Sequence, residues 1–198
     1  MTEFKQTWWD KNLPNRMEEF NAWIGDKNAQ SKVYCRRIVK KGNYKSLIDL
    51  GCGTATEFFA YKEEYPELKY LGIDGCKPLY DRNVKLGVPM LLSTVNDTKL
   101  LDDQYEVVFA RHVLEHQPIF QSTLEEMIRI GSQLAMHVFF MIPRDEPEGI
   151  GYNATDNLYH NRYDKRAIEK FLTNHSKVKA FEWQSINISE NVLLIYLK

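Results

Sequence analysis

Two hydrophobic patterns follow one another along the chain, and the change between them predicts where a sheet begins. Segments 15–26 and 28–42 place apolar residues at helical spacing and end at or beside a glycine, as helices do. From residue 46 onward, short apolar runs alternate with amphipathic segments, which predicts alternating strands and helices. We expect strands at 46–50, 68–74, 88–95, 105–111, 133–143, 177–186 and 191–198, and helices after residue 54 and at 79–85, 119–130 and 165–172.

This alternation predicts an α/β fold with a doubly wound, mostly parallel seven-stranded sheet and helices on both faces. Only the short polar segment 187–190 separates the last two strands, so the sheet should end in an antiparallel hairpin. We expect a single domain over residues 1–198, with an N-terminal helical arm or cap at 1–44 and a Rossmann-like core at 45–198. Residues 144–163 lack a clear pattern, and a loop of this length is typical of a lid-like segment.

Composition narrows the classes of function. The 26 Lys and Arg residues balance 27 Asp and Glu residues, so the chain has no net field to hold a polyanion and nucleic acid is not expected as its partner. Its three cysteines have no C-x-x-C spacing, which argues against a disulfide framework and a zinc ribbon. No apolar run has the length of a signal peptide or a membrane span, so we expect a cytoplasmic protein without a membrane partner.

The first predicted strand runs into a glycine turn that reads "DLGCGTATE" over residues 49–57. Gly51 and Gly53 allow a tight turn and a close approach of a ligand to the backbone. Thr54 and Glu57 have the spacing of a capping box, which predicts a helix that starts there. A pyrophosphate would be repelled by Asp49, whereas a ligand that carries an amino group would be attracted by it.

Two more acids follow at the ends of the next predicted strands. Asp74 lies 21 residues beyond Gly53 and could accept hydrogen bonds from both hydroxyls of a ribose. Asp97, in "VNDTKLL", could accept from an exocyclic amine such as adenine N6. The three acids therefore suit a ligand with an amine, a ribose and an adenine but without phosphate.

The segments "LIDLGCGTA", "YLGIDGC", "VNDTKLL" and "YEVVFARHVLEH" together resemble the successive motifs of class I S-adenosylmethionine-dependent methyltransferases. The resemblance covers residues 47–143 and departs from the family at Ala55, where a third glycine is frequent. It implies that S-adenosyl-L-methionine is the cofactor and S-adenosyl-L-homocysteine the product. By position, the resemblance implies that the methionine part of the cofactor lies against Asp49, Gly51, Cys52 and Gly53. It implies that the ribose lies at Asp74 and Gly75 and the adenine at Cys76, Asp97 and Thr98. The methyl-donating end of the cofactor would then lie beside Ala110, Arg111 and His112. We add Arg16 of the arm as a partner for the cofactor carboxylate.

Methyl transfer needs a positioned acceptor and, for some acceptors, a base. His112 follows the predicted fourth strand and His160 lies in the lid-like loop, so these two are the candidate catalytic residues, whereas His116 and His137 suit packing. Tyr152, Tyr159 and Arg162 of the loop are candidate substrate contacts, and no residues have metal-ligand spacing.

The leading hypothesis from the sequence is transfer to an oxygen or nitrogen atom of a small molecule, with the oligomeric state undetermined. The alternatives are an RNA or protein methyltransferase, or a non-catalytic regulatory or scaffolding protein that binds the cofactor. A nucleotide-dependent oxidoreductase is a further option. Asp49 and Thr56, which stands in place of a third glycine, count against it.

Overall fold

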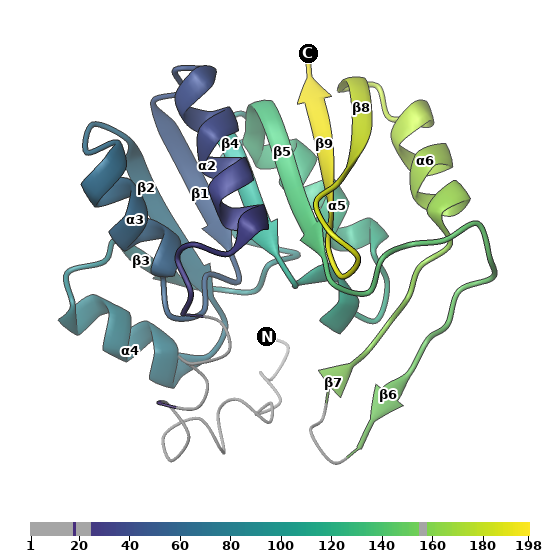
Figure 1. Cartoon of the computed structure of the whole chain (residues 1–198), viewed down its shortest axis with the longest axis horizontal. Coiled ribbons are helices and arrows are strands. Elements are labelled where there is room, and N and C mark those ends of the chain that lie inside the picture. Colours follow the sequence, from purple (N-terminus) through teal and green to yellow (C-terminus); the bar gives the residue numbers. More distant parts are fainter. Residues whose placement is uncertain (1–17, 19–24, 155–157) are drawn as a thin grey trace.

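The computed structural model describes residues 18, 25–154 and 158–198, and its centre is a seven-stranded sheet (Figure 1). The strands lie in the order β3-β2-β1-β4-β5-β9-β8. Their bounds are β1 Ser46–Leu50, β2 Lys69–Asp74, β3 Met90–Leu92, β4 Tyr105–Arg111, β5 Gly131–Phe139, β8 Val178–Ser185 and β9 Asn191–Leu197.

Strands β1 to β5 are parallel, and β9 is antiparallel to both β5 and β8. The predicted doubly wound sheet with a terminal antiparallel hairpin is therefore confirmed. The reason lies in the connections, because each parallel pair needs a crossover whereas the five residues 186–190 suffice to turn β8 back into β9.

Helices cover both faces of the sheet and give the domain two apolar cores (Figure 1). One core joins the sheet to α5, Gln121–Ile130, and α6, Lys165–Asn174. The other joins it to α2, Gln30–Lys41, and α3, Thr56–Glu64, while α4, Lys77–Lys85, packs beside β2 and β3. The inner strands β1, β4, β5 and β9 are mostly buried, as expected for a sheet between helical layers, whereas the edge strands β3 and β8 are partly exposed.

One local prediction is wrong: Thr54 and Glu57 do not form a capping box. The residue that caps α3 is Ala55, in the left-handed conformation, without a side-chain hydrogen bond to the helix. Glu57 is instead buried and accepts hydrogen bonds from Arg36 of α2, at 3.2 and 3.3 Å to its two oxygens. A buried carboxylate is stabilised more by a cation than by a cap, so the tertiary contact overrides the local signal.

The segment predicted as a lid-like loop contains a short hairpin, β6 Tyr152–Asn153 and β7 Leu158–Tyr159. It is drawn beside the main sheet in Figure 1. The predicted helix at 15–26 lies mostly outside the described residues, and so does Arg16. The division into arm and core at residues 44 and 45 stays a prediction, although α2 of that arm packs directly on the sheet.

Candidate functional site

The predicted site residues that follow β1, β2 and β4 lie at the carboxyl ends of these parallel strands. β1 lies between β2 and β4, and the chain leaves β1 toward β2 but leaves β4 toward β5. The loops after β1 and β4 therefore diverge, which opens the edge of the sheet at the point where open α/β folds bind ligands.

The glycine turn after β1 has a backbone that only small residues accept easily. Gly51 and Gly53 have φ values of +69° and +56°. A Cβ atom on Gly51 would lie 2.6 Å from the Cγ2 atom of Val113, which follows β4. The N–H groups of Gly51 and Cys52 both donate to the carbonyl of Ile73, so the turn is tied to β2.

Asp74 binds the glycine turn to the end of β2. One carboxylate oxygen accepts the N–H of Gly53 at 2.9 Å, and the other accepts the N–H of Cys76 at 2.8 Å. The side-chain amide of Asn83 in α4 also donates to the carbonyl of Gly53 at 2.8 Å. The predicted ribose acid and the predicted glycine turn are thus one hydrogen-bonded unit.

Asp49 lies beneath this turn and is 3% exposed. Burial raises the pKa of its carboxyl to about 8, although a hydrogen bond from the Tyr70 hydroxyl, 2.7 Å from Oδ2, acts in the opposite direction. A positive group brought to this carboxyl would favour its ionised form, which agrees with the predicted preference for an amine.

The predicted adenine residues after β3 are more dispersed. Asp97 is exposed and forms an ion pair with Lys99. Thr98 is buried, and both its N–H and its hydroxyl bond to Glu126 of α5. Their role in binding adenine stays a prediction, as does that of Cys76.

The end of β4 carries a charged cluster that the sequence analysis missed. Ala110 is fully buried, and the next residue, Arg111, donates to Glu190 at 2.7 Å. The same carboxylate oxygen lies 2.9 Å from Nε2 of His112. Glu190 belongs to the β8–β9 turn, and β9 runs antiparallel to β5, so the residue before β9 must lie at this edge. An acid just before an antiparallel strand was the signal that could have revealed it.

The cluster has a defined protonation state at neutral pH. Burial raises the pKa of Glu190, but the hydrogen bond from His112 and the charge of Arg111 outweigh it and lower the pKa to about 2. Burial lowers the pKa of His112 more than Glu190 raises it, so its ring is neutral. An ionised Glu190 accepts a hydrogen bond, so Nε2 of His112 carries the proton and Nδ1 has a lone pair.

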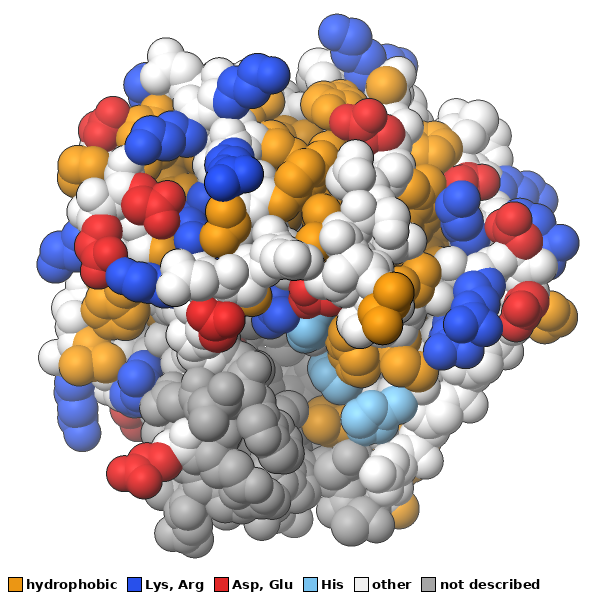
Figure 2. Space-filling view, viewed as in Figure 1, with side chains coloured by type: hydrophobic (Ala, Val, Ile, Leu, Met, Phe, Trp, Pro, Cys, Tyr) orange, Lys and Arg blue, Asp and Glu red, His pale blue; other side chains and the backbone are white. Residues whose placement is uncertain are grey.

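The structure brings the two candidate catalytic histidines to the ends of one row of rings. The ring of His112 lies 4.9 Å from Phe140, Phe140 lies 5.6 Å from His116, and His116 lies 5.3 Å from His160. Figure 2 shows His side chains close together on this face. His112 itself has an unusual φ of +57°, a strained conformation of the kind that concentrates at functional sites.

Segment 144–163 is anchored beneath this row of rings. Asn161 is fully buried; its amide donates to the carbonyl of Gln117 at 2.6 Å and its oxygen accepts the N–H of Gly151 at 3.1 Å. The Tyr163 hydroxyl donates to the carbonyls of Gln117 and Leu114, at 2.7 and 2.9 Å. These bonds fix the segment to the short helix η1, Leu114–His116.

The candidate substrate residues lie on the anchored segment. Tyr152 and Tyr159 face each other across β6 and β7, with ring centroids 5.2 Å apart. Arg162 and Gly149 exchange two backbone hydrogen bonds. The Nε atom of Arg162 is buried without a hydrogen-bond partner. Contact of these residues with substrate stays a prediction.

Two buried groups support the edge from within. Glu115 of η1 is fully buried and accepts the N–H of Phe140 at 2.7 Å, and burial raises the pKa of its carboxyl to about 8. His137 of β5 is also fully buried; its Nε2 accepts the N–H of Leu114 at 3.1 Å, which fits the predicted packing role.

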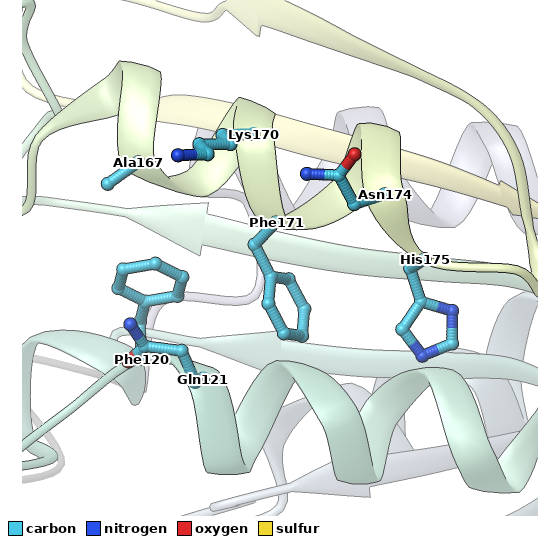
Figure 3. Close-up of a pocket in the computed structure, with 7 residues that line it drawn as sticks. All are labelled: Phe120, Gln121, Ala167, Lys170, Phe171, Asn174 and His175. Carbon is cyan, nitrogen blue, oxygen red and sulfur yellow. The ribbon is translucent and has the colours of Figure 1, made fainter.

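A separate groove of about 460 Å³ lies between α5 and α6 (Figure 3). It contains none of the residues of the glycine turn, Asp74 or the row of rings, so its size does not make it the site. Within the described ranges, no group of three or more His, Cys, Asp or Glu side chains is arranged to hold a metal ion. The groove between α5 and α6 is lined by Phe120, Gln121, Ala167, Lys170, Phe171, Asn174 and His175.

Comparison with known proteins agrees with this arrangement. Residues 48–137 match the family model described as a methyltransferase domain. Comparison with curated protein sequences finds no match. Among solved structures, magnesium protoporphyrin IX methyltransferase from Synechocystis PCC 6803, with bound SAM, is 12% identical with a TM-score of 0.69, covering 96% of this chain and 94% of that chain.

A second similar structure is 1,6-didemethyltoxoflavin-N1-methyltransferase from Burkholderia thailandensis, determined with bound 1,6-didemethyltoxoflavin and S-adenosylhomocysteine. It is 12% identical, with a TM-score of 0.68, and the match covers 96% of this chain and 88% of that chain. At this identity the two structures support the fold, and the family match supports the activity.

The sheet order and the glycine turn define a Rossmann-like α/β fold. The family model matches residues 48–137, which contain the glycine turn, Asp74 and His112, so this part of the chain is a methyltransferase domain. In the part of the chain that the structure describes, no helix has the length and apolar character needed to cross a membrane.

Proposed function

We propose that the chain transfers the methyl group of S-adenosylmethionine to an oxygen or nitrogen atom of a small molecule at the carboxyl edge of β1 and β4. The observation that carries this proposal is that the glycine turn and the His112–Glu190 pair face the same edge from the adjacent strands β1 and β4.

The residues of the edge fit the cofactor. A side chain on Gly51 would meet Val113 at 2.6 Å, so the turn after β1 can pack this closely against the residue after β4 only because position 51 is glycine. Asp74, fixed at the end of β2, suits the ribose hydroxyls, and Asp49 suits the amino group. We propose the same binding set as the sequence indicates: Asp49, Gly51, Cys52, Gly53, Asp74, Gly75, Cys76, Asp97, Thr98, Ala110 and Arg111, with Arg16 from outside the described residues.

His112 is the proposed base. When bound, the cofactor supplies a methyl group on a sulfonium, with a neutral thioether as the leaving group. Glu190 holds the Nε2–H of His112, so Nδ1 is the atom that accepts the proton of the acceptor hydroxyl or amine. Arg111 keeps Glu190 ionised and thereby keeps the ring in this tautomer.

The anchored segment 144–163 is the proposed acceptor side. Its hairpin brings Tyr152, Tyr159 and His160 from β6, β7 and the residue after β7, and Arg162 follows two residues later. The bonds of Asn161 and Tyr163 fix the base of the segment, so these side chains are held in place before an acceptor binds. Exclusion of water by this segment favours transfer to the acceptor.

Two features support a small molecule as the acceptor. The balanced charge of the chain gives no basic surface field for RNA. The similar proteins from Synechocystis PCC 6803 and Burkholderia thailandensis are methyltransferases named for magnesium protoporphyrin IX and 1,6-didemethyltoxoflavin, both small molecules.

The test is calorimetric titration of wild type and Asp74→Ala with S-adenosylmethionine, S-adenosylhomocysteine and NAD. We expect wild type to bind the first two and not NAD, and Asp74→Ala to lose at least about tenfold in affinity for both. Asp81→Ala on α4, which removes an exposed ion pair with Lys77, is the matched control and should bind as wild type does.

An acceptor screen follows, with release of S-adenosylhomocysteine as the readout. Turnover of a small molecule by wild type, reduced in His112→Gln while cofactor affinity is retained, would support the proposal. Binding of NAD alone would contradict it. Cofactor binding without turnover of small molecules, but with methylation of RNA or protein, would move the acceptor to a macromolecule.

A further inference from the structure

The chain after β5 is held by a carboxyl that does not belong to the sheet. Phe139 forms the last pair between β5 and β9, so the N–H groups of Phe140 and Met141 lie beyond the ladder. Oε1 of Glu115 accepts both of them, at 2.7 and 3.4 Å. Glu115 belongs to η1, which follows β4, and β4 is paired with β5. Its side chain therefore joins the ends of two neighbouring strands and fixes the path of the chain after β5.

The backbone of Glu115 is itself held by segment 144–163. Its carbonyl accepts the N–H of Asn161 at 2.9 Å, and the carbonyl of Leu114 accepts the Tyr163 hydroxyl at 2.9 Å. The side chain between these bonds and the end of β5 is fully buried. Because Glu115 is bonded at both its backbone and its carboxyl oxygen, it sets the spacing between η1 and the residues after β5.

Packing alone does not explain a carboxyl at this position. Oε2 of Glu115 has no hydrogen-bond partner among the residues that the structure describes, and Nε2 of His137 lies 3.7 Å away. A buried polar atom without a hydrogen bond destabilises the folded state, whereas an apolar side chain of similar size would fill the space without this cost. The two N–H groups that Oε1 accepts are the contacts that an apolar side chain could not make.

The residue fixed by Glu115 packs on the proposed base. The ring of Phe140 lies 4.9 Å from that of His112, centroid to centroid, at a tilt of 59°. The N–H of His112 donates to the carbonyl of Val138 at 2.9 Å, so the two rings start from neighbouring strand ends. The bond of Nε2 to Glu190 fixes one atom of the imidazole but still lets the ring turn about that bond. The ring of Phe140 restricts this turn and thereby the direction of Nδ1.

We propose that Glu115 is a positioning residue for methyl transfer: by its Oε1 bonds to the chain after β5 it holds the ring of Phe140 against His112 and so aims Nδ1 of His112 at the acceptor. This inference rests on the proposed role of His112 as the base. A base must lie at hydrogen-bond distance from the proton that it accepts, and a displacement of about 1 Å costs about a hundredfold in rate. Because Glu115 is fully buried, it acts through this geometry and not by contact with a ligand.

The test measures His112 by nitrogen-15 NMR titration of its ring in the full chain. Glu115→Met keeps the length of the side chain but removes the acceptor oxygen, whereas Glu115→Gln keeps that oxygen. We expect Glu115→Met to raise the pKa of His112 toward about 6.5, the value of a solvated histidine, because burial that lowers this pKa is lost when Phe140 moves. Glu115→Gln should restore the wild-type titration.

Electrostatic effects of the substitution itself are small in this titration. Burial raises the pKa of the Glu115 carboxyl to about 8, so the carboxyl is neutral while His112 titrates and its loss removes no charge. The other groups that interact electrostatically with His112 are unchanged in both variants, and they are Arg111, His116, His137 and Glu190.

Phe140→Ala tests the path through the ring. It should raise the pKa of His112 in the same direction, and the double variant Glu115→Met/Phe140→Ala should shift it no further than Phe140→Ala alone. Glu126→Met is the matched control, because Glu126 is a buried carboxyl of α5 that accepts the N–H of Thr98 at 2.7 Å. It should leave the titration of His112 unchanged. Urea unfolding shows whether each variant is folded.

An unchanged His112 in Glu115→Met, an equal shift in Glu126→Met, or a Glu115→Gln variant that behaves like Glu115→Met would overturn the inference. Additive shifts in the double variant would do the same. If Glu115→Met does not fold, Phe140→Ala decides, since an unshifted His112 there removes the contact through which Glu115 acts.

Turnover of an acceptor found by the screen separates this inference from the proposed function. A kcat about ten- to a hundredfold lower in Glu115→Met, with KM little changed and Glu115→Gln near wild type, supports the positioning role. Wild-type kcat in Glu115→Met would overturn that role. Full turnover by His112→Gln would instead contradict His112 as the base, and with it the proposed function of this pair.

Discussion

The two halves of the candidate site are assembled in different ways. The proposed cofactor half consists of the glycine turn and Asp74, two consecutive strand ends joined by hydrogen bonds that the backbone N–H groups of the turn donate to the Ile73 carbonyl and the Asp74 carboxylate. The acceptor half combines His112, Glu190, η1 and segment 144–163, which are distant in sequence and meet through side chains. The first half follows from local backbone geometry, whereas the second depends on how several segments pack.

This difference predicts how each half responds to change. A substitution in the cofactor half should alter cofactor binding and folding together, because the same backbone serves both. A substitution in the acceptor half should alter local order or proton affinity and leave the cofactor bound. The predictions below test that separation, beginning with the largest effect.

Gly51→Ala should cause the largest loss. The new Cβ would lie 2.6 Å from Val113 Cγ2 at a φ of +69°, so both a clash and a strained backbone result. We expect about 3–4 kcal/mol of destabilisation, measured by urea unfolding, and weaker binding of S-adenosylhomocysteine.

Gly87→Ala is the control for backbone strain alone. Its φ is +77°, but a Cβ there would meet nothing within 4 Å. It should therefore cost only about 1–2 kcal/mol. Equal losses in the two variants would show that the contact with Val113 is unimportant, and the cofactor half would then not depend on close backbone packing.

The same contrast explains what the sequence could predict. The strands β1 and β4 fall where the hydrophobic runs place them, and Gly51, Gly53 and Asp74 lie together because strand ends of a parallel sheet share one edge. These features depend on residues near one another in sequence. The capping box at Thr54 and Glu57 was wrong because Arg36, 21 residues away from Glu57, forms a stronger contact.

The acceptor half was predictable only in part. His112 and His160 were singled out separately, but their connection through Phe140 and His116 depends on the packing of η1 against the segment after β5. Glu190 lies 78 residues from His112, in a polar turn where the sequence pattern does not distinguish it from its neighbours. Such contacts require the register of β9 on β5, which the sequence pattern does not specify.

Asn161→Ala should have the next largest effect. It removes the amide bonds to Gln117 and Gly151 and leaves their partners unsatisfied beneath the hairpin. We expect about 2–3 kcal/mol of destabilisation and faster hydrogen exchange across residues 144–163. S-adenosylhomocysteine affinity should stay within about twofold of wild type, and a large loss would contradict the separation of the halves.

Asn187→Ala is the matched control for that substitution. Asn187 lies in the β8–β9 turn, away from segment 144–163, and its side-chain amide donates a 3.3 Å hydrogen bond to Gln30 of α2. Hydrogen exchange across 144–163 should therefore be unchanged in this variant.

Glu115→Gln should change the pH dependence of stability. The folded-state pKa of Glu115 is about 8 because of burial, whereas an unfolded Glu titrates near about 4.3. Between these values the folded state holds the extra proton, so wild type loses stability as pH rises toward 8. We expect Glu115→Gln to remove on the order of 2 kcal/mol of that loss, measured by unfolding at pH 5 and pH 8. An unchanged difference between the two pH values would show that Glu115 is already ionised in the folded protein.

Glu190→Gln should have the smallest effect on folding and the most specific effect on the site. Glu190 has a lowered folded-state pKa of about 2, so its contribution to stability is present above about pH 4.3 and is lost as pH falls toward 2. The variant should lack that loss and should be about 1–2 kcal/mol less stable than wild type at pH 7, because its amide oxygen can still accept from Arg111 and His112 but carries no charge.

The same variant tests the proposed base directly. The Glu190 carboxylate raises the pKa of His112 against the lowering effect of burial, so its removal should lower that pKa further. Titration of the His112 ring nitrogens by nitrogen-15 NMR would show this shift and the loss of the Nε2–H tautomer, since a neutral amide can either donate to Nε2 or accept from it. An unshifted His112 with its tautomer intact would mean that Glu190 only packs the β8–β9 turn. A shift accompanied by unchanged S-adenosylhomocysteine affinity would place Glu190 in the acceptor half, where it acts on the reaction through His112 and not on the cofactor.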